Sequence, residues 1–312
     1  MPSRTIAVVG ATGAQGGGVV DSLLQSPEFK VRALSSDPES LRARALLEKH
    51  KDAAAEGRIE LVKGDLNDPL SLEEALVGAD SLFAAFADSA DQEEQGKRLV
   101  DATKAANIKH FVYSSLPSIT KLSGGKFTSA GPFDAKAAVA DYAIKQLENV
   151  TLLFAGAFYS NLKSTFYAKR VDNVVQLCLP IGSSRKIQWV DECRDIGVFA
   201  AAVFSAPLST VTGKTYSVMA APQTLADLAA EYEAATGEKA VAAPQIMEDA
   251  LAAIPEEQKE TWRSMYGWRN AEPADTIAYG SMAPDEDLAL QELGVKASTL
   301  TEFLKRTGFR VP

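Results

Sequence analysis

The chain has few of the residues that hold metals or disulfides. Its 312 residues include two cysteines, Cys178 and Cys193, and two histidines, His50 and His110. The cysteines are too few for a disulfide scaffold and lack metal-ligand spacing, so we interpret them as inert thiols. His50 falls in a charged helical tail and His110 at the start of a strand, which indicates surface roles for both. The sequence therefore predicts no metal site.

Positive charge and long apolar runs are also scarce. The net charge is −9, and without a convincing basic patch the chain is not expected to bind nucleic acid directly. The apolar run 196–204 is about half of the ~18 residues that span a bilayer, so no membrane partner is expected. The N-terminal residues have the pattern of a strand, so no signal peptide is expected. We therefore expect a cytoplasmic protein.

The first half of the chain alternates short apolar strands with helical patterns. The expected strands are Thr5–Val9, Lys30–Leu34, Ile59–Lys63, Ser81–Ala85, His110–Ser114 and Thr151–Ala155. The expected helices are Gly17–Gln25, Pro38–Glu48, Pro69–Leu76, Asp91–Ala106 and Asp134–Gln146. Two of these helices begin with a capping carboxylate before a first-turn proline, at Asp37 and at Asp68. The alternation predicts an α/β fold, a Rossmann-type doubly wound parallel sheet.

Beyond residue 156 the pattern loosens and indicates a smaller, mostly helical lobe. We expect a dinucleotide-binding domain over residues 1–156 and a substrate- or partner-side lobe over 157–312, interleaved with the sheet near 182–221. The expected helices are Ser160–Arg170, Asp191–Ser205, Thr224–Thr236, Gln245–Ile254, Pro255–Tyr266 and Thr299–Thr307. Lys214–Met219 has the pattern of one more strand.

The stretch VVGATGAQGGGVV, residues 8–20, places glycines between the first strand and the first helix. Gly10 permits the tight turn, Gly13 lets the backbone approach a pyrophosphate, and Gly16 lets helix and strand pack closely. The free amides at the start of the helix then point toward the phosphates. The turn predicts dinucleotide binding by Gly10, Ala11, Thr12, Gly13, Ala14, Gln15 and Gly16.

Longer motifs carry a specific family resemblance. The chain resembles the NmrA-like family of atypical short-chain dehydrogenases in GATGAQGG, FKVRALS, KGDLNDPLSLEEAL, EEQGKRLVDATKAANIKHFVYSS, FDAKAAVADY and AGAFYSN. That family includes fungal nitrogen-metabolite regulators, a human NADP(H) sensor and working reductases. The implied cofactor contacts are Asp65 and Leu66 at the adenine, Phe86, Ala87 and Asp88 near the ribose and pyrophosphate, and Phe158, Tyr159, Ser160 and Asn161 at the nicotinamide.

The choice of nucleotide stays open at this point. In Rossmann folds an acid after the second strand binds the ribose diol of NAD, and an arginine there binds the extra phosphate of NADP. The chain has Ser35, Ser36 and Asp37 there, and Ser36 stands where the resemblance places the arginine. Asp37 fits a ribose-binding acid or a helix cap, whereas Ser35, Ser36 and Arg42 could serve a phosphate. The resemblance favours NADP(H), and the local residues slightly favour NAD(H).

The usual catalytic dyad of short-chain dehydrogenases is incomplete. In that Tyr-x-x-x-Lys pattern the lysine is Lys136, but Pro132 stands in the tyrosine position and has no proton to donate. Tyr142 falls on a different side of the helix and is a poor replacement. The resemblance implies that Lys136 binds the nicotinamide ribose and, in reductase relatives, takes part in catalysis. We assign Lys136 and Ser115, which ends the fifth strand, as candidate catalytic residues.

The aromatic segment WRSMYGWRN falls where family members line the cavity over the nicotinamide. Either it is plain core, or Met265, Tyr266 and Trp268 line a pocket for a flat hydrophobic substrate. Two functions remain open. One is a redox-sensing regulator that acts through a protein partner, for which nuclear entry is possible. The other is an NAD(P)H-dependent reductase of a small hydrophobic carbonyl, imine or activated double bond. A closed apolar pocket would favour the reductase, and a blocked nicotinamide site would favour the regulator.

Overall fold

A seven-stranded parallel sheet forms the centre of the computed structural model, which describes residues 3–86, 89, 91–252, 254–272 and 288–312. The strand order is β11-β6-β5-β4-β1-β2-β3, and the direction of winding reverses between β1 and β4. The strands are β1 (Arg4–Val9), β2 (Phe29–Ser35), β3 (Ile59–Lys63), β4 (Ser81–Ala84), β5 (His110–Ser115), β6 (Val150–Ala155) and β11 (Thr215–Val218). The predicted Rossmann-type fold is confirmed.

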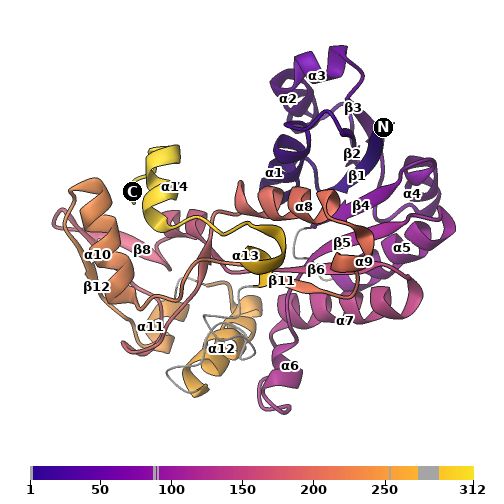
Figure 1. The fold of residues 1–312 in the computed structure, drawn as a ribbon. Helices are drawn as coiled ribbons and strands as arrows, with labels where there is room; N and C mark the ends of the chain where they lie inside the picture. The colour runs from indigo at the N-terminus through magenta and orange to yellow at the C-terminus, as the bar shows by residue number, and fades with distance from the viewer. Residues whose placement is uncertain (1–2, 87–88, 90, 253, 273–287) are drawn as a thin grey trace.

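Helices cover both faces of this sheet, because its strands are apolar on both sides. Ile6 and Val8 of β1 pack into one core, and Ala7 and Val9 pack into the other. The first core is closed by α1 (Ala14–Leu23), α2 (Leu41–Lys49), α3 (Lys51–Ala55) and α8 (Asp195–Ser205). The second is closed by α4 (Pro69–Leu76), α5 (Gln92–Ala105) and α7 (Gly131–Gln146). These strands and helices are called the sheet lobe (Figure 1).

The second lobe lies beside the sheet lobe and has its own core (Figure 1). It contains β7 (Ala157–Phe158), η1 (Tyr159–Lys163), β8 (Ala168–Val171), β9 (Val174–Leu177), β10 (Trp189–Val190), α10 (Leu225–Thr236), β12 (Ala240–Ala242), α11 (Met247–Leu251), α12 (Glu256–Ala271) and α14 (Leu300–Thr307). Strands β12, β9 and β8 form a three-stranded sheet that the sequence did not predict. Between these elements the chain returns to the sheet lobe through α8, α9 (Leu208–Val211) and β11, and α13 (Leu288–Leu293) packs on α8 and β11.

The helix predicted over 160–170 is wrong. The structure has the short 3-10 helix η1 and then strand β8. Tyr159, Leu162 and Phe166 are all buried, and their spacing imitates one face of an α-helix. The chain instead buries the first two from a 3-10 turn and the third from the turn that enters β8.

Two local predictions also fail. Asp37 does not cap a helix: α2 begins at Leu41, with Ser40 as its cap. The Asp37 carboxylate instead accepts from the Glu39 amide at 3.0 Å. Asp68 does cap α4, accepting from the Ser71 amide at 3.3 Å. His110 is not a surface residue, because it is 4% exposed at the start of the inner strand β5. Within the described ranges, no helix is long and apolar enough to cross a bilayer.

Candidate active-site cleft

A cleft of about 1590 Å³ opens at the carboxyl ends of the sheet strands. The sheet lobe supplies Gln15 from α1, Phe86 after β4, Ser115 at the end of β5 and Lys136 from α7. The second lobe supplies the opposite side, chiefly from α12, which lies below the sheet and near α6 (Ile119–Leu122) in Figure 1. Because carboxyl ends at a switch point are where doubly wound folds bind ligands, this cleft is the candidate site.

The glycine turn lies at the inner end of this region, between β1 and α1. Gly10 has φ +77°, and a Cβ there would lie 2.0 Å from the carbonyl oxygen of Ala85. A Cβ on Gly16 would lie 2.2 Å from the Gly10 carbonyl oxygen, so both glycines are required by packing. Gly13 differs: it is exposed, and its Cβ would meet only the Gly10 carbonyl oxygen, at 3.3 Å. The backbone at Gly13 is therefore open to close approach from outside.

The first turn of α1 has amides available at this turn. Helix α1 begins at Ala14, three residues before the predicted start, and its first bond runs from the Gly17 amide to the Gly13 carbonyl at 2.8 Å. The amides of Ala14, Gln15 and Gly16 precede that bond, which makes this end of α1 suited to an anion. The Ser114 hydroxyl donates to the Gln15 side-chain oxygen at 2.5 Å and fixes that side chain against β5.

The residues predicted at the adenosine end lie in turns that follow β2 and β3. The Asp37 amide donates to the Ser35 hydroxyl at 3.2 Å, whereas Ser36 is exposed. Asp65 accepts from the Asn67 amide at 2.8 Å, and Leu66 packs against the sheet core. Phe86 stacks on Tyr113 with 5.6 Å between ring centroids. Ala87 and Asp88 lie outside the described residues.

Lys136 and Ser115 line the cleft together. The Ser115 hydroxyl donates to the backbone carbonyl of Lys136 at 3.2 Å, which ties the start of α7 to the end of β5. Pro132 stands in the first turn of α7, where a proline is tolerated because the amide it lacks would have no helical partner. Tyr142 donates to Asp101 at 2.8 Å, away from the cleft lining. Lys136 is therefore presented to the cleft without the usual tyrosine.

The four residues predicted at the nicotinamide are divided by the structure. Phe158 and Asn161 line the cleft. Ser160 lies close to Glu192, a buried carboxyl whose pKa is raised by burial. Tyr159 is fully buried in the second lobe, where its ring stacks on Trp189 and its hydroxyl donates to the Ser298 carbonyl at 3.3 Å. Because Tyr159 belongs to this core and does not line the cleft, we leave it out of the candidate site.

An aromatic wall forms the side of the cleft that faces the sheet lobe. Trp262 and Tyr266 stack with centroids 5.9 Å apart, and Tyr167 meets Trp262 edge to face at 6.4 Å. These three residues are called the aromatic wall, and all of them line the cleft. Met265 and Trp268, predicted as pocket residues, line it too. The sequence missed Trp262 and Tyr167, although Trp262 stands in the aromatic segment that it singled out.

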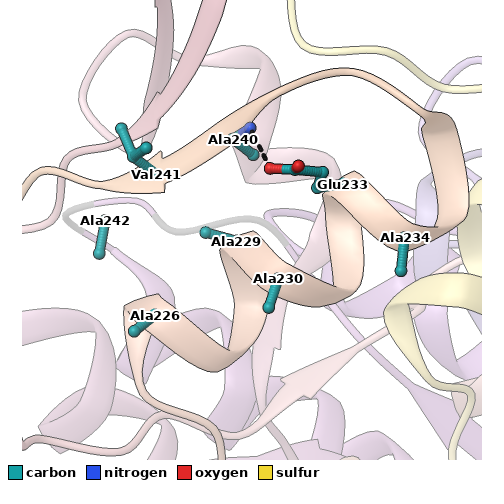
Figure 2. A pocket seen from close by; sticks show the side chains of 8 residues that line it. All are labelled: Ala226, Ala229, Ala230, Glu233, Ala234, Ala240, Val241 and Ala242. Carbon is teal, nitrogen blue, oxygen red and sulfur yellow. Dashed lines mark hydrogen bonds between the residues drawn. The ribbon is translucent and has the colours of Figure 1, made fainter.

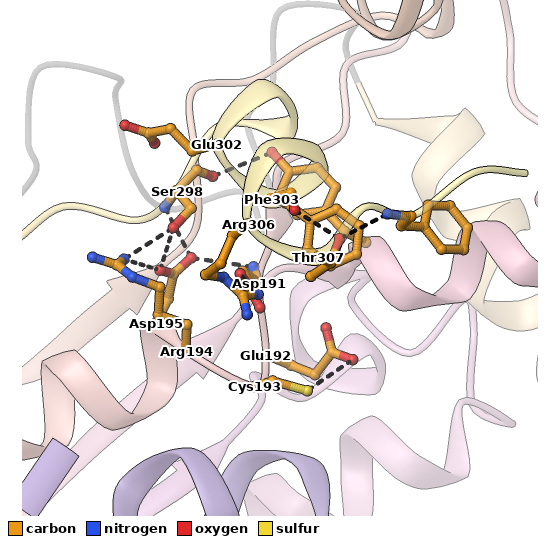
Figure 3. A network of polar contacts seen from close by, with 12 residues as sticks. Asp191, Glu192, Cys193, Arg194, Asp195, Ser298, Glu302, Phe303, Arg306 and Thr307 are labelled. Atoms are coloured by element: carbon orange, nitrogen blue, oxygen red, sulfur yellow. Dashed lines mark hydrogen bonds and ion pairs between the residues drawn. The ribbon is translucent and has the colours of Figure 1, made fainter. Parts of the chain in front are cut away.

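The sheet lobe and the second lobe are joined by a buried carboxylate network (Figure 3). Asp195, at the start of α8, accepts from the Ser298 amide at 2.8 Å and from the Ser298 hydroxyl at 2.7 Å. Asp191 pairs with Arg306 of α14. Nearby, partial burial and the Glu192 and Asp191 carboxylates raise the pKa of Cys193 to about 11, so that its thiol stays protonated at neutral pH. The network fixes α14 against α8.

A second hollow, of about 590 Å³, lies between α10 and β12 on the second lobe. Alanine side chains line most of it, and Glu233 accepts from the Ala240 amide at 3.1 Å, as Figure 2 shows. It shares no lining residue with the cleft, and Glu233 is the one titratable side chain among its described lining residues.

Relatives of the chain include oxidoreductases of fungi. The NmrA-like oxidoreductase FrzB of a Cladobotryum species is 38% identical over 133 residues, which are 39% of this chain and 36% of that protein. The NmrA-like oxidoreductase hkm9 of Aspergillus hancockii is 34% identical over 169 residues, 51% of this chain and 48% of that protein. These matches span less than half the length of either relative.

Solved structures show the same fold over almost the whole chain. NmrA, a negative transcriptional regulator, in complex with NAD superposes with TM-score 0.73 at 22% identity, covering 99% of this chain and 93% of that one. The triphenylmethane reductase of a Citrobacter species, complexed with NADP(H), superposes with TM-score 0.72 at 24% identity, covering 97% of this chain and 99% of that one. The NADPH-dependent quinone oxidoreductase QOR2 of Escherichia coli superposes with TM-score 0.74 at 23% identity, covering 97% of this chain and 100% of that one. The family description NmrA-like matches residues 2–304, and the chain belongs to the NmrA-like family.

Proposed function

We propose that the chain is an NADP(H)-dependent reductase whose hydride acceptor is an aromatic electrophile bound in the cleft. The observation that carries the proposal is the cleft itself. It holds about 1590 Å³ at the end of the sheet where the glycine turn lies, with the aromatic wall on one side and Lys136 on the other. An open cleft at this place gives an acceptor room beside the cofactor, whereas a blocked nicotinamide site would favour a regulator. The oxidoreductase names of the fungal relatives support the same reading.

The glycine turn fits a nicotinamide dinucleotide. Gly10 and Gly16 hold the turn, Gly13 leaves space for a pyrophosphate, and the first amides of α1 can bind its oxygens. For the adenosine end we propose NADP(H) over NAD(H). The Asp37 carboxylate accepts a hydrogen bond within its own turn, which makes it less available to bind a ribose diol. Arg42 is exposed on the first turn of α2, where it could bind the extra phosphate of NADP(H).

The proposed roles follow from the placement of each residue. A bound reduced nicotinamide would supply the hydride. Lys136 binds the nicotinamide ribose and donates a proton to an acceptor oxygen. Ser115 acts as a positioning residue, because its hydroxyl proton is directed to the Lys136 carbonyl rather than into the cleft. The aromatic wall binds the apolar body of the acceptor.

The decisive assay follows NADPH oxidation with two acceptors. Malachite green, a triphenylmethane dye, takes up a hydride at its central carbon and needs no proton. Menadione, a quinone, needs both a hydride and a proton. We expect both to be reduced, and calorimetry to show tighter binding of NADPH than of NADH.

Lys136→Ala separates ribose binding from proton donation. Loss of a general acid typically lowers the rate 10²- to 10⁴-fold, so we expect a fall in kcat/KM for menadione of roughly 100-fold or more. For malachite green the fall is expected to be roughly tenfold, from weaker cofactor binding alone. Lys145→Ala, which changes an exposed lysine in the last turn of the same helix, is the matched control. Equal falls in kcat/KM for menadione and malachite green would contradict the assignment of Lys136 as the proton donor.

The alternative function is a regulator that binds the cofactor without turnover, as the likeness to the NmrA fold allows. Calorimetric binding of NADPH with no oxidation by either acceptor would favour it over the reductase.

A further inference from the structure

Three polar side chains lie close together at the aromatic wall of the cleft. The Tyr167 hydroxyl lies close to the Tyr266 hydroxyl and to the Asn161 side chain. The three residues come from η1, from the turn that enters β8 and from α12, and all three line the cleft. We call Asn161, Tyr167 and Tyr266 the phenol cluster.

The phenol cluster is held rigidly. The Tyr167 amide donates to the Ser164 carbonyl at 2.9 Å, and the Tyr167 carbonyl accepts from the Cys178 amide at 2.9 Å. The Tyr266 ring stacks on Trp262 and lies 5.5 Å from Phe166. Each hydroxyl therefore has a fixed place relative to the aromatic wall, and rigid polar groups of this kind set the orientation of a ligand.

Packing alone does not account for these hydroxyls. Burying a phenol is unfavourable unless its hydroxyl is hydrogen-bonded, and a phenylalanine would fill the same space without that requirement. Phe166, next to Tyr167, packs against the same Trp262 and Tyr266 rings with no polar atom. Asn161 adds both a donor and an acceptor to the cluster. Two phenols and an amide at one cleft wall are what recognition of a polar atom requires.

We propose that the phenol cluster recognises an oxygen substituent, a hydroxyl or a carbonyl, on an aromatic substrate, with Tyr167 as the specificity-determining residue. The inference rests on the proposed reductase function and adds the substrate class: an oxygenated aromatic compound whose rings lie on the aromatic wall.

Recognition, rather than proton transfer, is the role that suits these phenols. Burial raises the pKa of Tyr167 and raises that of Tyr266 well above its usual range. Both hydroxyls therefore stay neutral at physiological pH and act as hydrogen-bonding groups. Their removal is expected to change KM and binding more than kcat.

The test compares two ligands of the same shape on the NADP⁺-loaded chain by equilibrium dialysis. The probes are 2-naphthol and 2-methylnaphthalene, in which a methyl group replaces the hydroxyl. With Tyr167→Phe, loss of one hydrogen bond predicts roughly 3- to 10-fold weaker binding of 2-naphthol and a change of less than about 2-fold for 2-methylnaphthalene. Tyr266→Phe, which removes the other hydroxyl, should show the same selectivity at smaller size.

Tyr142→Phe is the control, because its hydroxyl bonds to Asp101 outside the cleft. Equal weakening of both probes by Tyr167→Phe, no change in either, or no binding of either probe would overturn the phenol-cluster proposal. NADPH oxidation without probe selectivity would refute this inference and leave the reductase standing. Selective binding of 2-naphthol without NADPH oxidation would support recognition by the phenol cluster and refute the reductase function.

Discussion

The sheet lobe and the second lobe bury their strands to different degrees, and this decides how well each can be read from sequence. All six residues of β5 are buried, as are all four of β4, so each strand is a short apolar run between helices. In β8 only Ala168 of the run Ala-Lys-Arg-Val is buried. A strand covered on both faces leaves a strong pattern, whereas a short, half-covered strand leaves almost none.

The chain that returns from the second lobe is the part that completes the sheet lobe. Helix α8 packs on α1, and β11 adds the last strand beside β6. Three predictions test how closely these returning segments are bound to the first half, and how far local sequence signals can be trusted.

The largest effect is expected where α1 crosses the start of α8. A Cβ on Gly18 would lie 2.2 Å from the Cys193 carbonyl oxygen, and one on Gly197 would lie 2.0 Å from the Gly18 carbonyl oxygen. Gly18→Ala should therefore lower the free energy of unfolding by about 3 kcal/mol, measured by urea denaturation. Gly17→Ala is the control, since its nearest atom is 3.5 Å away and alanine favours the helix by up to about 1 kcal/mol. Similar free energies of unfolding for the two variants would mean that the close approach of the start of α8 to Gly18 does not limit the side chain there.

A pH dependence of comparable size is expected from His110. Burial is the main cause that lowers its pKa from 6.5 to about 4. Its ring nitrogen Nε2 lies 2.8 Å from the Thr151 hydroxyl, which itself donates to the Val211 carbonyl at 2.7 Å, so Nε2 carries the proton of a neutral ring. Between pH 6.5 and 4 the unfolded chain binds a proton that the folded chain does not.

The contribution of neutral His110 to the free energy of unfolding is therefore fully present above pH 6.5. It is lost as the pH falls toward 4, and the loss is about 3 kcal/mol for a pKa shift of this size. His110→Gln keeps a donor for Thr151 but cannot be protonated. Its unfolding free energy, followed by denaturant titration at several pH values, should fall less steeply than that of the unchanged chain. Parallel curves would show that other groups cause the acid sensitivity.

The smallest effect separates two identical sequence signals. Asp37 and Asp68 both precede a proline, yet only Asp68 caps a helix. Asp68→Ala should cost about 1 kcal/mol, and Asp37→Ala less than about 0.5 kcal/mol, in the same unfolding measurement. Equal costs would contradict the assignment of the cap to Ser40.

Sequence reasoning predicted the sheet, the glycine-rich turn between β1 and α1, and a lysine on α7 that lines the cleft, because each depends on local signals. It missed what depends on tertiary contacts. The spacing of Tyr159, Leu162 and Phe166 looks helical, and only the core of the second lobe shows that a 3-10 turn buries them. His110 looks exposed at a strand entrance, but the segment around Val211 covers it. Tyr167 lies about a hundred residues before Tyr266 in sequence, so their proximity left no signal in either segment.

The central claim is that a hydride is transferred in the cleft, and isotope transfer tests it most directly. The chain is incubated with malachite green and NADPH that carries deuterium at C4. Two forms of NADPH are used in turn, one deuterated on each face of C4. The account predicts that one of the two forms delivers its deuterium to the central carbon of the reduced dye. Dye that stays oxidised with both forms, while calorimetry shows NADPH bound, would contradict the proposed reductase function.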